Sequence, residues 1–176
     1  MNAAQLDSLV RRDGCASATF LGVYPRDKLP RPAVVPTSTP ITLIVNHDVS
    51  GSPGTHWSAI YAHPSERIGC YFDPWGAPPP APFASFLDIL TNGNWVYSRR
   101  RLQSVFSTTC GQFCLVFIWR KCRGYRFVDI LDMFPESQHH QQRVNDCLAV
   151  KFVAERYGMR TDVVDKDFLG ELLGLY

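Results

Sequence analysis

The chain has 176 residues, of which 45% are hydrophobic and 12% aromatic, so it can build one ordinary globular domain and is not a disordered chain. Charged residues make up 19%, and the formal net charge of +2 permits contact with nucleic acid without arguing for it. The longest apolar run, residues 113–119, is far shorter than the roughly 20 residues of a membrane-spanning helix. The N-terminus carries no secretory signal, so we expect an intracellular protein with reduced cysteines and no membrane contact.

The first half of the chain predicts a sheet with little helix. A short helix is expected to open the chain, because Leu6, Leu9 and Val10 recur at helical spacing and Gly14 can end the helix. Strands are expected where β-branched and aromatic residues gather, over residues 19–24, 41–46, 56–62, 68–72 and 95–98. Proline-rich connections separate them, and Pro82 lies at the start of an expected helix over residues 83–90.

The second half of the chain predicts helices. They are expected over residues 110–122, over residues 126–133, along an apolar stripe of Val144, Cys147, Leu148 and Phe152 that ends near Gly158, and after Asp165. We therefore expect an α+β fold in which helices flank a central mixed sheet. Residues 1–176 form one domain in this interpretation, with a sheet-rich lobe over about residues 1–107 and a helical lobe over residues 108–176.

A histidine and an aspartate are expected to meet across a hairpin. The turn His63-Pro64-Ser65-Glu66 joins two expected strands, and a regular hairpin centred on it pairs Tyr61 with Ile68 and His56 with Asp73. Opposed residues have Cβ atoms roughly 4.5–5.5 Å apart, which lets a carboxylate orient an imidazole and stabilise its charged form. The alternatives are a surface pair without function and a bulge that shifts the register.

Cys110 begins the expected apolar helix after two threonines. The helix dipole at that position favours a thiolate, and a neighbouring imidazolium makes the thiol a nucleophile near neutral pH. Gly111 would let a substrate backbone come close, and the Gln103 side chain could donate to an oxyanion beside the Cys110 N–H. The other cysteines are interpreted as small buried hydrophobic residues, with Cys114 facing the core.

Together these residues resemble the adenovirus-type cysteine endopeptidase (adenain) family. The resemblance spans about residues 5–120 and is carried by Asp13-Gly14-Cys15, Phe20 to Tyr24, Ile44-Val45-Asn46, His56-Trp57, Asp73, Gln103, Cys110-Gly111 and Phe113-Cys114. It implies a catalytic triad of His56, Asp73 and Cys110 with Gln103 in the oxyanion hole, in a clan that includes proteases of ubiquitin-like proteins. The family more often has glutamate where this chain has Asp73.

The resemblance also implies a biological role. It implies a viral endopeptidase that cleaves precursor capsid and core proteins at glycine-containing sites during virion maturation, in the host nucleus and the virion. No cofactor is expected for the chemistry, and the family implies an activating capsid-derived peptide and DNA. The chain has no cysteine between Cys70 and Cys110, where family members tether the peptide. We therefore expect an enzyme that is active alone or binds its activating peptide without a disulfide, by strand addition beside residues 95–98. We also expect the protein to be a monomer.

Several alternatives stay open at this point. The same machinery suits an isopeptidase of ubiquitin- or SUMO-like proteins. The basic clusters Arg99 to Arg101 and Arg120 to Arg123 fit weak DNA binding, or a capsid- or nucleic-acid-binding module that is not an enzyme. Trp57 either lines the substrate cleft or is a core aromatic residue. No metal site is expected, because His139-His140 lacks further ligands.

Overall fold

The computed structural model describes residues 1–52, 54–135 and 141–158. Its centre is a five-stranded sheet whose spatial order follows the sequence: β1 (Phe20–Pro25), β2 (Ile41–Asn46), β3 (Trp57–His63), β4 (Ile68–Phe72) and β5 (Trp95–Tyr97). β1 runs parallel to β2, and β5 runs parallel to β4, whereas β3 is antiparallel to both of its neighbours. The sheet is therefore mixed, as expected.

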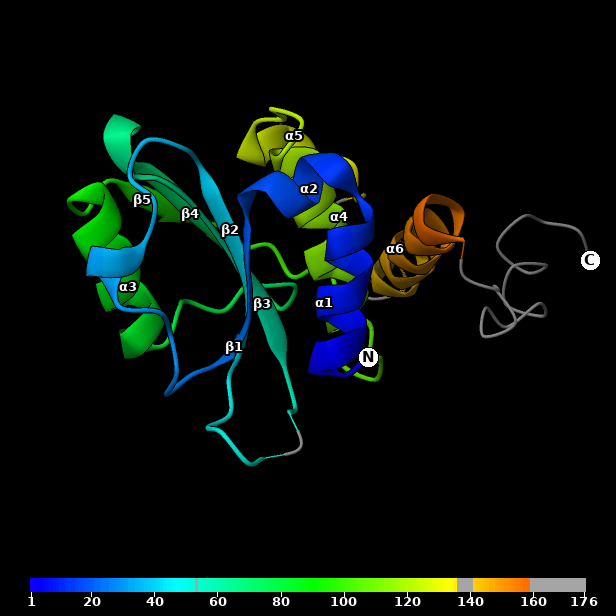
Figure 1. The fold of residues 1–176 in the computed structure, drawn as a ribbon. Coiled ribbons are helices and arrows are strands. Elements are labelled where there is room, and N and C mark those ends of the chain that lie inside the picture. Colours follow the sequence, from blue (N-terminus) through cyan, green and yellow to red (C-terminus); the bar gives the residue numbers. More distant parts are fainter. Residues whose placement is uncertain (53, 136–140, 159–176) are drawn as a thin grey trace, which may run out of the picture.

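Helices cover both faces of the sheet (Figure 1). One face packs against α3 (Ala81–Thr91), the crossover between the parallel strands β4 and β5. The other face packs against a group of helices: α1 (Ala3–Arg12), α2 (Gly14–Thr19), α4 (Cys110–Lys121), α5 (Phe127–Leu131) and α6 (Gln141–Tyr157). Single 3₁₀ turns lie at Pro32–Val34 and Pro64–Glu66. The expected α+β fold is confirmed.

The sheet and α4 form the centre of the core. Every residue of β2 is buried, because helices cover both of its faces, and α4 is buried along most of its length. The Phe72 and Phe117 rings stack with centroids 4.9 Å apart and join the end of β4 to α4. In the part of the chain that the structure describes, no helix is long and apolar enough to span a bilayer.

Gly14 does not end the first helix as expected. Asp13 ends α1 and also caps α2, because its carboxylate accepts a hydrogen bond from the Ala16 N–H at 2.9 Å. The chain therefore turns at Asp13 and starts a second short helix at Gly14. This second helix was not predicted from the sequence.

The helix expected to end near Gly158 is present as α6, and Phe152 packs against the core, but the buried face of α6 differs from the expected apolar stripe. The buried residues are Asn145, Asp146, Ala149, Val153 and Ala154, whereas Leu148 is 39% exposed. Two polar residues take the buried face because their side chains bind the chain segment before α4. The helix expected after Asp165 lies outside the described residues.

Candidate active site

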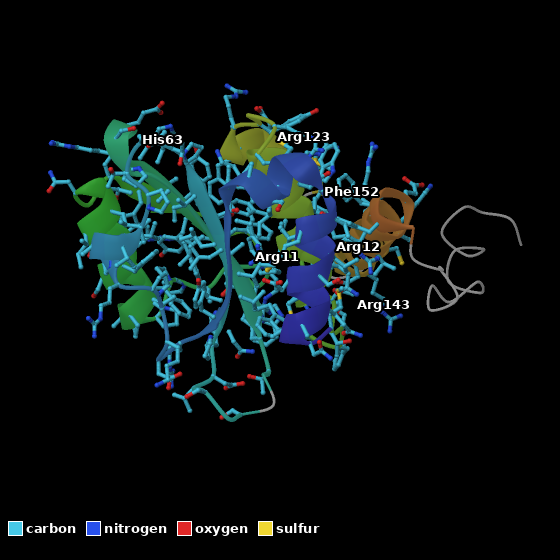
Figure 2. The ribbon with its side chains drawn as sticks, viewed as in Figure 1. Arg11, Arg12, His63, Arg123, Arg143 and Phe152 are labelled. Atoms are coloured by element: carbon cyan, nitrogen blue, oxygen red, sulfur yellow. The ribbon has the colours of Figure 1, made fainter. Side chains whose placement is uncertain are left out.

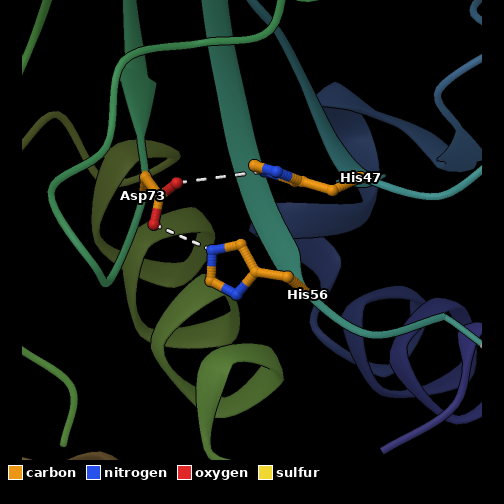
Figure 3. A group of neighbouring side chains, drawn as sticks. All are labelled: His47, His56 and Asp73. Atoms are coloured by element: carbon orange, nitrogen blue, oxygen red, sulfur yellow. Dashed lines mark hydrogen bonds and ion pairs between the residues drawn. The ribbon is translucent and has the colours of Figure 1, made fainter. Parts of the chain in front are cut away.

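The candidate site lies where three strand ends meet (Figure 3). His47 directly follows β2, His56 directly precedes β3, and Asp73 directly follows β4. His56 Nε2 lies 2.9 Å from Asp73 Oδ1, so the expected pair is formed. Both side chains are buried, which argues against a solvent-exposed surface pair.

The hairpin register that predicted this pair is wrong by two residues. His63, not Tyr61, lies opposite Ile68, because the turn spans the four residues Pro64 to Arg67 and closes with Arg67 at φ 54°. A shift of two residues returns each side chain to the same face of the sheet. His56 and Asp73 therefore still share a face and meet beyond the last paired residues, Ala59 and Phe72.

The turn after β4 holds Asp73 and His56 in place. The Trp75 N–H donates to Asp73 Oδ1 at 2.7 Å, and the Trp75 ring stacks on His56 with centroids 4.0 Å apart. Burial lowers the pKa of His56, but the hydrogen bonds and charges of Asp73 and Cys110 outweigh burial and raise this pKa to about 9. The stacked indole also favours the charged imidazole.

Cys110 is the first residue of α4, and it is the second residue, after Asp73, that raises the pKa of His56. Because Asp73 takes Nε2, the His56 nitrogen left for the thiol is Nδ1, a buried atom with no hydrogen-bond partner among the described residues. Cys114 lies one turn further into α4 and is fully buried, which raises the pKa of its thiol well above the ordinary value. Of these two cysteines, only Cys110 acts on the pKa of His56.

A buried carboxylate from α6 shapes the segment before Cys110. Asp146 Oδ1 accepts hydrogen bonds from the hydroxyls of Thr109 at 2.6 Å and Ser107 at 2.9 Å, and Oδ2 accepts from the Ser104 N–H at 3.3 Å. Burial raises the pKa of Asp146, although these donors favour its charged form. Thr109 is the N-cap of α4, but its hydroxyl is engaged with Asp146 and makes no capping bond. The first N–H groups of α4 are thus left for an incoming anion.

Gln103 is buried close to this segment. The backbone N–H groups of Leu102 and Gln103 both donate to the Pro74 carbonyl, at 2.8 and 3.0 Å, which ties Gln103 to the turn that holds Asp73. Gly76, at φ 70°, permits this approach, since a Cβ there would lie 2.6 Å from the Arg99 carbonyl oxygen. The Gln103 amide donates one hydrogen to the Ser107 carbonyl at 2.9 Å, which leaves its second hydrogen for another acceptor.

Trp57 and Gly111 both pack inside the protein. Trp57 is only 6% exposed and its indole N–H donates to the Met1 carbonyl at 3.1 Å, which favours the alternative of a core aromatic residue. A Cβ at Gly111 would lie 3.1 Å from a Leu6 methyl group, so this glycine permits close packing of α4 on α1. The expectation that Gly111 lets a substrate backbone come close stays a prediction.

His47, which was not predicted from the sequence, also lies in the site. Its Nε2 lies 2.8 Å from the Ser58 hydroxyl, 3.0 Å from the Tyr71 hydroxyl and 3.9 Å from Asp73 Oδ2. Burial and the charge of His56 lower the pKa of His47 to about 4. Trp75 was missed as well, although the sequence Asp73-Pro74-Trp75-Gly76 has the signature of a tight turn, with proline second and glycine fourth.

The basic clusters are partly engaged within the molecule. Arg100 binds Asp132 and the Phe134 carbonyl, both at 2.8 Å, and Arg123 binds Asp13 at 2.7 Å and lies over the Trp119 ring. Figure 2 shows Arg123 on the helical side of the molecule, the side that also carries Arg11, Arg12 and Arg143. These contacts leave less free charge for phosphate than the sequence clusters indicate.

Comparisons with known proteins agree with this fold. No protein-family model and no curated protein sequence matches the chain. Its structure is similar to that of the ASFV pS273R protease, with a TM-score of 0.59 and 13% identity over 91% of this chain and 68% of that chain. The chain therefore shares the fold of this protease.

Two further solved structures are more distant. ChlaDub1 from Chlamydia trachomatis has a TM-score of 0.44 at 15% identity, over 68% of this chain and 60% of that chain. The SUMO protease Ulp1 has a TM-score of 0.43 at 8% identity, over 87% of this chain and 78% of that chain. The narrower resemblance to the adenain family stays a prediction.

Proposed function

We propose that the protein is a cysteine endopeptidase in which Cys110, His56 and Asp73 form the catalytic triad. The observation that carries the proposal is the buried His56 ring, which is bound to Asp73 through Nε2 and interacts with the thiol at the start of α4. The fold shared with the ASFV pS273R protease supports it. No cofactor is needed for this chemistry.

In the proposed mechanism the Cys110 thiolate attacks the scissile carbonyl carbon while His56 holds the proton. The oxyanion that forms is stabilised by the Cys110 N–H and the second hydrogen of the Gln103 amide. His56 then protonates the leaving amine, which yields a thioester on Cys110. A water molecule that gives its proton to His56 hydrolyses this thioester and regenerates the Cys110 thiolate beside the protonated His56.

For the substrates we propose viral precursor polypeptides, cut at glycine-containing sites during virion maturation in the host nucleus and the virion. The resemblance to the adenain family motivates this assignment. An activating capsid-derived peptide would bind without a disulfide, and β5 offers an edge strand for it, since β5 pairs only with β4 among the described strands. We also propose that the protein is a monomer and that it binds DNA weakly, with an affinity that falls as the salt concentration rises.

Peptide hydrolysis tests the proposal. Purified protein is assayed on short peptides with Gly-Gly sites, with and without capsid-derived peptides, beside the variants Cys110→Ala and Cys114→Ala. We expect Cys110→Ala to abolish turnover and Cys114→Ala to keep most of it per folded molecule. Substantial turnover by Cys110→Ala would overturn the mechanism, and a mixed disulfide needed for activity would overturn non-covalent activation.

The second candidate is an isopeptidase of ubiquitin- or SUMO-like proteins. The observation that favours it is a pair of exposed apolar side chains in the segment before Cys110, Val105 at 53% and Phe106 at 89% exposure. Exposed apolar residues beside a nucleophile suit contact with a folded substrate. Cleavage of a ubiquitin-like fusion much faster than a Gly-Gly peptide would favour this candidate. Loss of both activities with retained DNA binding would favour the non-enzymatic alternative.

A further inference from the structure

Two histidines aim the same nitrogen at one buried carboxylate. His56 Nε2 lies 2.9 Å from Asp73 Oδ1, and His47 Nε2 lies 3.9 Å from Asp73 Oδ2, on the other side of the carboxylate (Figure 3). The three ligand atoms all lie within 4.8 Å of one another, the one such group among the described residues. We call this group the His47–His56–Asp73 pocket. The proposed reaction uses His56 and Asp73 and gives His47 no role.

The donor set of the pocket is one that zinc prefers. Two imidazole nitrogens and one carboxylate oxygen form three-ligand zinc sites in proteins, with a fourth position left to water. Bonds of about 2.0–2.1 Å place the ligand atoms roughly 3.3 Å apart around tetrahedral zinc, so side-chain shifts of about 1–1.5 Å convert the pocket into a site. The His47 side chain is 21% exposed, which gives an ion a route from solvent.

We propose that the His47–His56–Asp73 pocket binds zinc and that bound zinc inhibits the enzyme. The inhibitory half of the proposal rests on the proposed function. Zinc takes the lone pair of His56 Nε2, so the proton that this nitrogen donates to Asp73 is released to solvent. His56 is then no longer oriented by Asp73, and any proton on its Nδ1 is held by a neutral zinc-bound ring, which donates a proton to the leaving amine less readily than imidazolium does.

A different zinc site would use Cys110 Sγ and His56 Nδ1, so the test must separate the two. Zinc binding to the full-length Cys110→Ser chain is measured by calorimetry, alone and combined with His47→Asn or with His63→Asn. His63 is the matched control, because it ends β3 far from the pocket and pairs with Glu66. We expect one zinc ion per Cys110→Ser chain, at least tenfold weaker binding with His47→Asn, and unchanged binding with His63→Asn.

Binding lost in Cys110→Ser, or unaffected by His47→Asn, would overturn the proposed site. A second measurement avoids dependence on the folding of the His47 variant: zinc added to Cys110→Ser must shift the imidazole NMR signals of His47 and His56 and leave that of His63 unchanged.

Inhibition is tested separately, with the activity of each variant compared to its own rate without zinc. His47→Asn should raise the inhibitory zinc concentration at least tenfold, and binding without inhibition would overturn only the inhibitory half.

Discussion

At the residue scale, the Gln103 side chain tests how the oxyanion is bound. Its amide already donates one hydrogen to the Ser107 carbonyl, so the second hydrogen is the one proposed to act in catalysis. Gln103→Ala and Gln103→Glu should both lower kcat/KM by about 10²–10³, because both remove the amide donor. Steady-state kinetics on a Gly-Gly peptide provide the measurement. A loss of tenfold or less in both variants would remove Gln103 from the oxyanion hole.

The base and the acid that orients it should differ in their effects. His56→Ala should reduce kcat as much as Cys110→Ala does, since neither step of the mechanism proceeds without the base. Asp73→Asn should leave measurable activity, because the amide keeps part of the hydrogen bonding to His56 but cannot stabilise its charge. Single-turnover hydrolysis compares the three variants. Equal activity of His56→Ala and the unmodified protein would contradict the proposed base.

The sequence was sufficient to name the residues of the proposed triad, but it did not predict the residues that surround them. His56 and Asp73 were brought together by a hairpin argument whose register was wrong by two residues, and the pair survived because face alternation has a period of two. His47 directly follows β2, the antiparallel neighbour of β3. Its position near Asp73 depends on tertiary contacts with Ser58 and Tyr71. No local pattern indicates that position.

At the element scale, α6 is expected to hold the nucleophile segment in place through Asp146. Asp146→Ala leaves the hydroxyls of Ser107 and Thr109 without their acceptor, so it should lower the free energy of unfolding by about 1–3 kcal/mol and reduce kcat more than it changes KM. The control is Asp129→Ala, which removes an exposed ion pair with Arg126 and should change little. Urea denaturation and kinetics measure both. Equal effects of the two variants would contradict the role of Asp146.

The pH dependence of stability provides a second test of Asp146. Burial raises its pKa above the ordinary 3.8, so the folded chain binds this proton more tightly than the unfolded chain. The contribution of this bound proton to the free energy of unfolding is therefore fully present below pH 3.8 and is lost as the pH rises through the raised pKa of Asp146. Relative to Asp146→Asn, the unmodified protein should lose stability over that window and level off above it. A difference in unfolding free energy that stays constant with pH would contradict this.

The prediction of elements from the sequence succeeded for two strands and failed for the buried face of α6. The strands at Ile41–Asn46 and Ile68–Phe72 were predicted to the residue, because dense β-branched and aromatic residues mark a buried sheet. On α6 the apolar pattern pointed to Leu148, whereas Asn145 and Asp146 are buried. Polar residues face inward there because distant backbone and hydroxyl donors satisfy them, and an apolar stripe cannot reveal such partners.

At the scale of the whole molecule, stability should depend on the contact between the sheet and α4. Phe117 is fully buried and stacks on Phe72, the residue directly before Asp73. Phe117→Ala should lower the free energy of unfolding by about 3–5 kcal/mol, through lost burial and a cavity. Phe117→Leu keeps most of the volume and should cost less than half as much. Chemical denaturation measures both, and equal costs would contradict the packing account.

The central claim is that Cys110 is the nucleophile and that His56 activates it. A peptide vinyl sulfone ending in Gly-Gly, incubated with the protein and then mapped by tandem mass spectrometry, tests this claim most directly. We predict one adduct per chain, on Cys110, with the labelling rate strongly reduced in His56→Ala and unchanged in Cys114→Ala. Labelling spread over other cysteines, or labelling of Cys110 at the same rate without His56, would contradict the account.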